Sequence, residues 1–149
     1  MVLAVFQETS PSVFEQISYD LDLSNPITTT HNGQLGETHE KKLYLGRPDG
    51  NTSTFTNITV TPKSLTTQDI DPAGVDPTSW GVKIIIDPGH LPTETDWDSV
   101  DYGDPIDEED IGDISTSLVP FWMRIESPRG ISVQNKTNIY LELEYTETL

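Results

Sequence analysis

Apolar and polar residues alternate along several stretches of the chain, most clearly near its C-terminal end. Apolar side chains occupy every second position in 119–125 and again in 139–145. A period of two residues is typical of a β-strand that buries one face. Because Pro128 and Gly130 between the two stretches favour a turn, we predict that they form a hairpin. A lone hairpin is only marginally stable, so a second sheet should cover its apolar face.

Further strands are predicted wherever the alternation returns or a short apolar run occurs, namely at 2–6, 13–23, 41–45, 54–61 and 80–86. The Pro-Asp-Gly step at 48–50 favours a second hairpin, between 41–45 and 54–61. The run 84–86 is apolar on both faces, which is typical of a central strand. No stretch has the period of an amphipathic helix. The chain is therefore predicted to be all-β, a single antiparallel β-sandwich of immunoglobulin-like or jelly-roll type.

The chain has 149 residues, which suits one domain. We expect residues 1–12 to form an N-terminal arm or edge strand. Residues 13–149 form the sandwich in this prediction, with a long acidic loop at 87–113. The predicted core shared by the two sheets consists of Ile84, Ile86, Leu141 and Leu143 together with Trp122 or its neighbours Phe121 and Met123.

Charge limits the kinds of partner. With 25 acidic and 8 basic residues the net charge is −17, which disfavours binding to nucleic acid and to anionic membrane surfaces. There is no cysteine, so thiolate metal sites and disulfides are excluded. No stretch is apolar for long enough to span a bilayer, and the N-terminus lacks a signal-peptide pattern. We expect a soluble protein made in the cytoplasm, although a high-salt habitat is a separate explanation for its acidity.

The stretch 87–113 contains 11 acidic residues and neither lysine nor arginine. Its carboxylates could bind Ca²⁺, but their spacing does not match the EF-hand loop. The alternative is a solvated, mobile loop that its charge keeps soluble. We expect 94–113 to be the most mobile part of the isolated chain, because like charges repel one another unless a cation or a basic partner neutralises them.

The stretch 82–90, Val-Lys-Ile-Ile-Ile-Asp-Pro-Gly-His, resembles the opening strand of zinc-dependent N-acetylmuramoyl-L-alanine amidases. The resemblance implies that His90 is a metal ligand. However, no histidine follows His90, whereas a catalytic zinc site needs three protein ligands and an open position. The alternative is a buried strand that ends in an ordinary Asp-Pro-Gly turn.

The other two histidines, His31 and His39, lie eight positions apart and have no third ligand nearby in sequence. No serine triad, Walker loop or dinucleotide fingerprint occurs. We therefore expect a non-enzymatic protein and assign no catalytic, metal-binding or cofactor-binding residue.

Aromatic and apolar positions suggest where a partner could bind. Trp80 and Trp122 lie in strand patterns and are expected in or near the core. Trp97 stands among acids with few apolar neighbours, so we predict that it contacts a partner. The apolar run at the N-terminus could be buried by a neighbouring subunit. Its candidate contact residues are Val2, Leu3, Val5 and Phe6.

Four features together resemble the small β-sandwich domains of tailed-phage virions. They are 40–45 with its Pro-Asp-Gly turn, 55–60, 121–130 and the last strand, and the resemblance spans about 14–145. Such domains serve as capsid decoration, tail, baseplate or fibre-adaptor parts. The resemblance implies a virion structural protein that docks on other subunits, and on copies of itself, in a symmetric assembly.

A carbohydrate-binding or adhesin module is the alternative function. A planar row of exposed tryptophan and tyrosine on one sheet face would favour the sugar-binding function. A flat, self-associating sheet edge or an extended terminal arm would favour the virion function.

Overall fold

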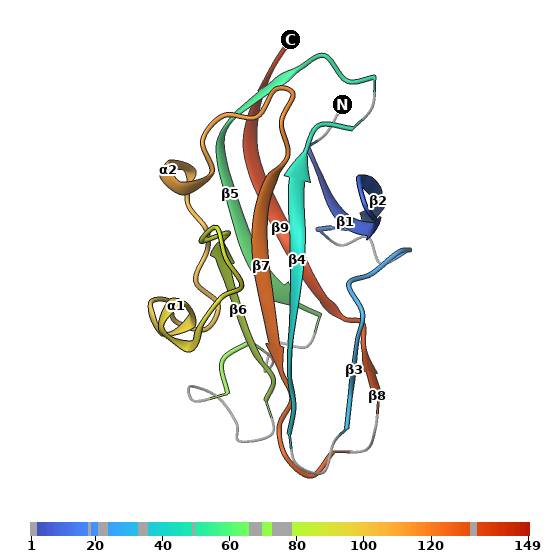
Figure 1. Cartoon of the computed structure of the whole chain (residues 1–149), viewed down its shortest axis with the longest axis vertical. Helices are drawn as coiled ribbons and strands as arrows, with labels where there is room; N and C mark the ends of the chain where they lie inside the picture. Colours follow the sequence, from blue (N-terminus) through green and yellow to red (C-terminus); the bar gives the residue numbers. More distant parts are fainter. Residues whose placement is uncertain are drawn as a thin grey trace.

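The computed structural model describes residues 3–17, 19–20, 24–32, 36–48, 50–65, 70–72, 79–131 and 134–149. Strands dominate this part of the chain (Figure 1). In chain order the strands and helices are β1 (Ala4–Ser10), β2 (Val13–Ile17), β3 (Thr29–His31), β4 (Thr38–Gly46), β5 (Thr54–Ser64), β6 (Gly81–Ile86), α1 (Glu94–Asp98), α2 (Glu108–Ile111), β7 (Val119–Glu126), β8 (Gln134–Lys136) and β9 (Ile139–Thr148).

The larger sheet has five antiparallel strands in the order β2-β1-β4-β7-β6. β7 lies between β4 and β6, with Met123 opposite Lys41 on one side and Ile84 on the other. Successive side chains of a strand point to opposite faces. Met123 is accordingly buried, while its neighbour Trp122 is only half-buried on the outer face.

The strands β5 and β9 form a second layer that packs against the inner face of the larger sheet (Figure 1). Their register places Val60 opposite Leu143. A bulge interrupts the ladder between Thr56 and Thr59. Within it, Asn57 has a φ of 53°, a left-handed conformation that asparagine adopts more readily than most residues.

Both sheets share one core, which confirms the predicted all-β antiparallel sandwich. The core prediction is also largely confirmed. Of the two alternatives on β7, Phe121 and Met123 point inward, whereas Trp122 does not. Ile86 only packs against the margin of the core. The predicted residues that are buried are Ile84, Phe121, Met123, Leu141 and Leu143.

Both predicted hairpins are wrong. β7 pairs with β4 and β6, whereas β9 pairs with β5 in the other sheet. Likewise β4 pairs with β1 and β7, and not with β5. Alternation determines which face of a strand is buried, but a connection with turn residues can cross between sheets as well as reverse within one.

The N-terminal strand and the apolar run at 84–86 also differ from prediction. β1 is neither an arm nor an edge strand, because it lies between β2 and β4 in the larger sheet. β6 is at the edge of that sheet and not at its centre. It can be apolar on both faces because one face meets the core and the other meets the segment that holds α1 (Figure 1).

The acidic stretch contains two short helices that the sequence pattern did not predict, α1 and α2. Three isoleucines in and after the stretch, at 106, 111 and 114, are buried. Ile106 exchanges two backbone hydrogen bonds with Val60, at 2.9 and 3.1 Å, and Ile114 exchanges two with Phe55, at 2.8 and 2.9 Å. This segment therefore lies along the outer edge of β5.

A two-stranded ribbon, β3 with β8, stands apart from the two main sheets (Figure 1, lower right). Thr29 pairs with Lys136 and His31 with Gln134. The sequence pattern did not predict a strand at β3. The ribbon brings His31 beside the start of β4.

Candidate functional site

β2 is the open edge of the larger sheet. It pairs with β1 on one side, and no strand of the described residues pairs with it on the other. Asn25 satisfies one carbonyl near the end of the strand, since its Nδ2 donates to Gln16 O over 2.9 Å. At the other end, Val13 and Phe14 are 52% and 36% exposed. An unpaired edge that carries apolar side chains is a place where a further strand can add.

Other strand edges are covered by the chain itself. Along β6, the amide of Val82 donates to Ile70 O over 2.9 Å. Along β9, the amide of Leu143 donates to Asp20 Oδ1 over 2.9 Å. The outer edge of β5 carries the two isoleucine bridges described above. β2 thus differs from these three strands, because its outer backbone edge is open.

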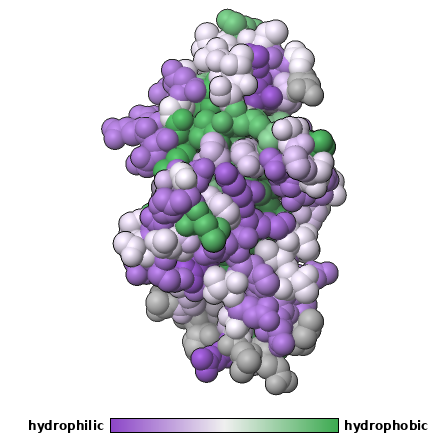
Figure 2. All heavy atoms as spheres, viewed as in Figure 1, coloured by the Kyte–Doolittle hydropathy of each residue, from purple (hydrophilic) through white to green (hydrophobic). Residues whose placement is uncertain are grey.

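A groove of about 780 Å³ lies over the outer face of the larger sheet next to β2, and its lining residues come from β1, β2, the end of β4 and the approach to β7. Phe14 is held at its rim by an edge-to-face contact with Tyr44, with ring centroids 5.0 Å apart. Figure 2 shows hydrophobic residues gathered on the upper part of this face, between α2 and β2. We call this surface the docking groove, lined by Phe6, Ser12, Val13, Phe14, Gln16, Arg47, Pro48, Thr116 and Leu118.

The N-terminal residues predicted to contact a partner fall in three different places. Val2 lies outside the described residues. Leu3 and Val5 are fully buried in the chain's own core, so they are not available as surface. Phe6 is half-buried and lines the docking groove.

Trp97 was predicted to be exposed and to contact a partner, but its side chain is 0% exposed. Helix α1 begins with a capping box in which Thr93 accepts from the amide of Asp96 and Asp96 accepts from the amide of Thr93. This turn directs Trp97 inward, where the guanidinium of Arg124 lies 5.7 Å from the centre of its ring. Trp97 therefore anchors α1 to the larger sheet.

His90, the residue of the amidase-like motif, lies on the surface. Its side chain is 57% exposed, and its Nδ1 is 3.8 Å from Asp96 Oδ2. The motif's Asp87 accepts hydrogen bonds from the amide of Gly89 and from Trp122 Nε1, each over 3.2 Å. Among the described residues His90 belongs to no group of three metal ligands. The local structure is a strand followed by a hydrogen-bonded turn.

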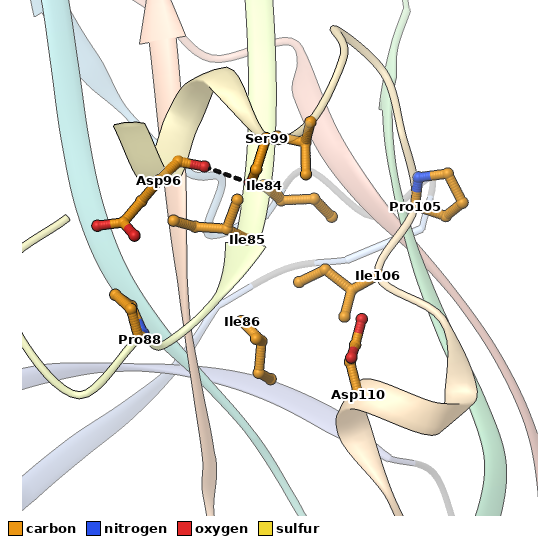
Figure 3. Close-up of a pocket in the computed structure, with 10 residues that line it drawn as sticks. Ile84, Ile85, Ile86, Pro88, Asp96, Ser99, Pro105, Ile106 and Asp110 are labelled. Atoms are coloured by element: carbon orange, nitrogen blue, oxygen red, sulfur yellow. Dashed lines mark hydrogen bonds between the residues drawn. The ribbon is translucent and has the colours of Figure 1, made fainter. Parts of the chain in front are cut away.

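A smaller cavity, of about 260 Å³, lies between β6 and the acidic stretch. Figure 3 shows isoleucines of β6 on one side and Pro105 and Ile106 on the other, with Asp96 and Asp110 at the rim. The carboxylate of Asp96 is already engaged by Thr93, over 2.8 Å to its amide. This cavity is mainly an apolar gap behind the short helices.

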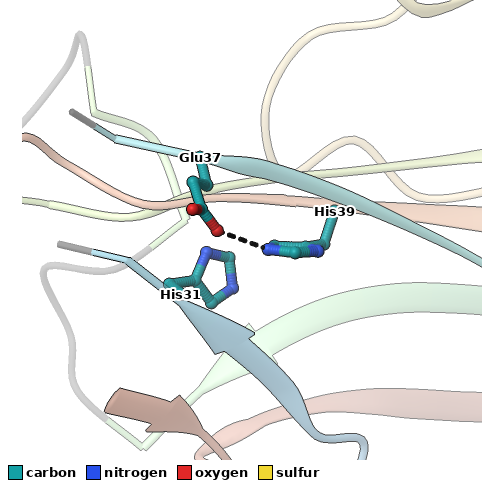
Figure 4. Close-up of side chains that lie close together, drawn as sticks. All are labelled: His31, Glu37 and His39. Carbon is teal, nitrogen blue, oxygen red and sulfur yellow. Dashed lines mark hydrogen bonds and ion pairs between the residues drawn. The ribbon is translucent and has the colours of Figure 1, made fainter. Parts of the chain in front are cut away.

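A compact cluster of polar side chains lies where the β3–β8 ribbon meets the start of β4. It consists of His31, Glu37 and His39, each of which offers one ligand atom within 4.8 Å of the others (Figure 4). His39 Nε2 donates to Glu37 Oε2 over 2.9 Å. The rings of His31 and His39 meet edge to face, with centroids 4.5 Å apart. We call these three residues the histidine cluster.

The two histidines differ in environment. His31 is 0% exposed, and its Nε2 is 2.7 Å from Thr29 Oγ1. Its Nδ1 is buried and makes no hydrogen bond, although it lies near the main chain of Glu37. Burial, and then the neighbouring His39, lower the pKa of His31 to about 4, so its imidazole is neutral at pH 7. The hydrogen bond from His39 holds the pKa of Glu37 below its usual value, which keeps the carboxylate ionised.

Sequence reasoning missed this cluster for a topological reason. The missing third ligand is Glu37, which stands only two positions before His39, just ahead of the start of β4. What no local pattern shows is that β3 pairs with β8 and so carries His31 to the same place. A search for a carboxylate two positions before each histidine would have found the pair Glu37 and His39, but not His31.

No helix of the described residues is long and apolar enough to cross a membrane. Comparison of the chain with protein-family models, with curated proteins and with solved structures found no match.

Proposed function

We propose that this chain is a non-enzymatic structural protein that docks onto other protein subunits through its docking groove, with a tailed-phage virion as the setting. One observation carries the proposal: β2 presents an open edge with exposed Val13 and Phe14, while the chain itself covers the outer edges of β5, β6 and β9. The virion setting rests on the resemblance of strands and turns to virion sandwich domains.

The charge of the chain specifies the partner's chemistry. Glu8 and Glu15 are exposed on the two strands that flank the groove. The whole chain carries a net charge of −17, so direct docking of a second copy would bring like charges together. The partner that fits is a different subunit whose apolar strand or loop is flanked by lysine or arginine. Multiple copies then follow from the symmetry of that partner's ring or lattice.

Aromatic side chains favour docking over sugar binding. A sugar platform needs exposed aromatic faces, yet all three tryptophans and all five tyrosines are buried or half-buried. Trp80 is 5% and Trp97 0% exposed. Trp122, on the outer face of β7, is held by its bond to Asp87.

The test of the setting is mass spectrometry and electron microscopy of phage particles purified from the source of the sequence. We expect the chain in such particles at a fixed ratio to a capsid or tail subunit, with its sandwich visible at the surface of that subunit. Absence from every particle, together with saturable binding of the purified chain to a glycan, would replace the docking proposal with the sugar-binding one.

A further inference from the structure

The histidine cluster lies away from the docking groove and plays no part in the proposed docking. Its members come from two separate parts of the fold: His31 ends β3, whereas Glu37 precedes β4 and His39 is the second residue of β4. We propose that His31, Glu37 and His39 form a binding site for a divalent transition metal ion, with Zn²⁺ as the preferred ion, three protein ligands and one open coordination position.

The ligand set favours zinc over calcium or magnesium. Two imidazoles and one carboxylate are ligands that Zn²⁺ takes in three-ligand sites. Ca²⁺ and Mg²⁺ prefer sets made of oxygen atoms. The three ligand atoms already lie within 4.8 Å of one another, so an ion between them requires only small side-chain movements.

The buried nitrogen of His31 is a second, independent observation. A buried polar atom without a partner is costly, and Nδ1 of His31 is such an atom. Figure 4 shows one ring nitrogen of His31 turned toward the Glu37 carboxylate. The other nitrogen, Nε2, has Thr29 Oγ1 at 2.7 Å. A metal-bound histidine is commonly held in this way, with one nitrogen on the ion and the other on a neighbouring polar group that fixes its tautomer.

Binding an ion here would exchange one interaction for another. His39 Nε2 now donates its proton to Glu37 Oε2. With the ion between them, His39 would take the tautomer that carries its proton on Nδ1, so that Nε2 presents its lone pair, while the carboxylate would bind the ion directly. The side chains of His39 and Glu37 are 39% and 37% exposed, so the ion can enter from solvent and a water or a partner's side chain can reach the open position.

One nearby group opposes the ion and limits its affinity. Lys136 is 8% exposed, and its Nζ lies 4.5 Å from the centre of the Trp80 ring. Trp80 in turn meets His31 edge to face, with centroids 4.6 Å apart. The ammonium and the imidazole thus contact the same indole. We expect weaker binding than at a closed site with four ligands.

The experiment is calorimetric titration of the purified chain with ZnCl₂, with melting temperature measured in parallel. The wild type should bind one Zn²⁺ saturably and melt at a higher temperature when it does. His39→Gln and Glu37→Gln should each weaken binding by about tenfold or more, by comparison with the loss caused by altering groups around metal ligands. Both residues are half-exposed, so both variants should melt near the wild type without metal.

The matched control is His90→Gln, which removes the remaining histidine, an exposed one beside Asp96. It should bind Zn²⁺ as the wild type does. An excess of CaCl₂ should leave zinc binding unchanged, which separates the cluster from the acidic stretch. No saturable binding, equal binding by Glu37→Gln and the wild type, or a loss in His90→Gln as large as in His39→Gln would each overturn the proposal.

Discussion

Trp122 donates a hydrogen bond from its indole Nε1 to Oδ1 of Asp87 over 3.2 Å, and this contact ties the end of β6 to the outer face of β7. Lys42 Nζ lies 3.5 Å from the other carboxylate oxygen, on the neighbouring strand β4. The turn that resembles an amidase motif is thus held by structural contacts across three strands.

The contact predicts a pH-dependent loss of stability in Trp122→Phe. Burial of Asp87 opposes its ionisation, but the Gly89 amide, Trp122 and Lys42 together hold its pKa below 3.8. The stabilisation is therefore complete above about pH 4 and is lost as the pH falls through the lower, folded-state pKa. We expect Trp122→Phe to cost about 1 kcal/mol at pH 7 and progressively less below pH 4.

Urea unfolding at pH 7 and pH 3 measures this difference, with Asp87→Asn and the double variant completing a cycle. The cycle should show coupling between the two residues at pH 7. An equal cost of Trp122→Phe at both pH values would mean that the indole stabilises the fold by packing alone.

The shared core predicts a large cost for truncation in the second sheet. Leu141 is fully buried between the sheets. Leu141→Ala should lower the free energy of unfolding by about 2 to 5 kcal/mol. Leu65 is 52% exposed, so Leu65→Ala is the matched control. It should change the free energy of unfolding by less than about 0.5 kcal/mol. Similar unfolding midpoints for the two variants would contradict this core.

Backbone bridges in and after the acidic stretch predict slow hydrogen exchange at two positions. The amides of Ile106 and Ile114 donate to Val60 O and Phe55 O, each over 2.9 Å. We expect both amides to be protected in calcium-free buffer, because their partners lie on β5 in the core. Exchange at the rate of an unfolded chain would instead support the mobile loop that the charge of this stretch predicts.

Strand faces could be predicted from the sequence, whereas strand partners could not. Phe121, Met123 and Leu141 were assigned to the core correctly because a period of two residues determines the buried face. Pairing depends on strands distant in sequence, such as β5 with β9, and the turn residues near Pro128 gave no sign of a change of sheet. Helices of five and four residues are too short to show a helical period.

The candidate sites were only partly visible in the sequence for similar reasons. Acids around Trp97 suggested exposure, yet the cap at Thr93 turns its ring toward Arg124. The pattern Thr93-x-x-Asp96 was the available signal for that turn. The open edge at Val13 and Phe14 could not be foreseen, because which strand lies at a sheet's edge depends on the pairing of the whole chain.

Photo-crosslinking on assembled particles tests the docking proposal most directly. A benzophenone amino acid in place of Phe14 sits at the docking groove, and the same probe in place of Leu91, 70% exposed, provides the matched control near β6. We predict that the probe at position 14 crosslinks to a different virion subunit, at a segment rich in lysine or arginine, and that the probe at position 91 does not. Crosslinks from position 91 with none from position 14 would contradict docking through the open edge of β2.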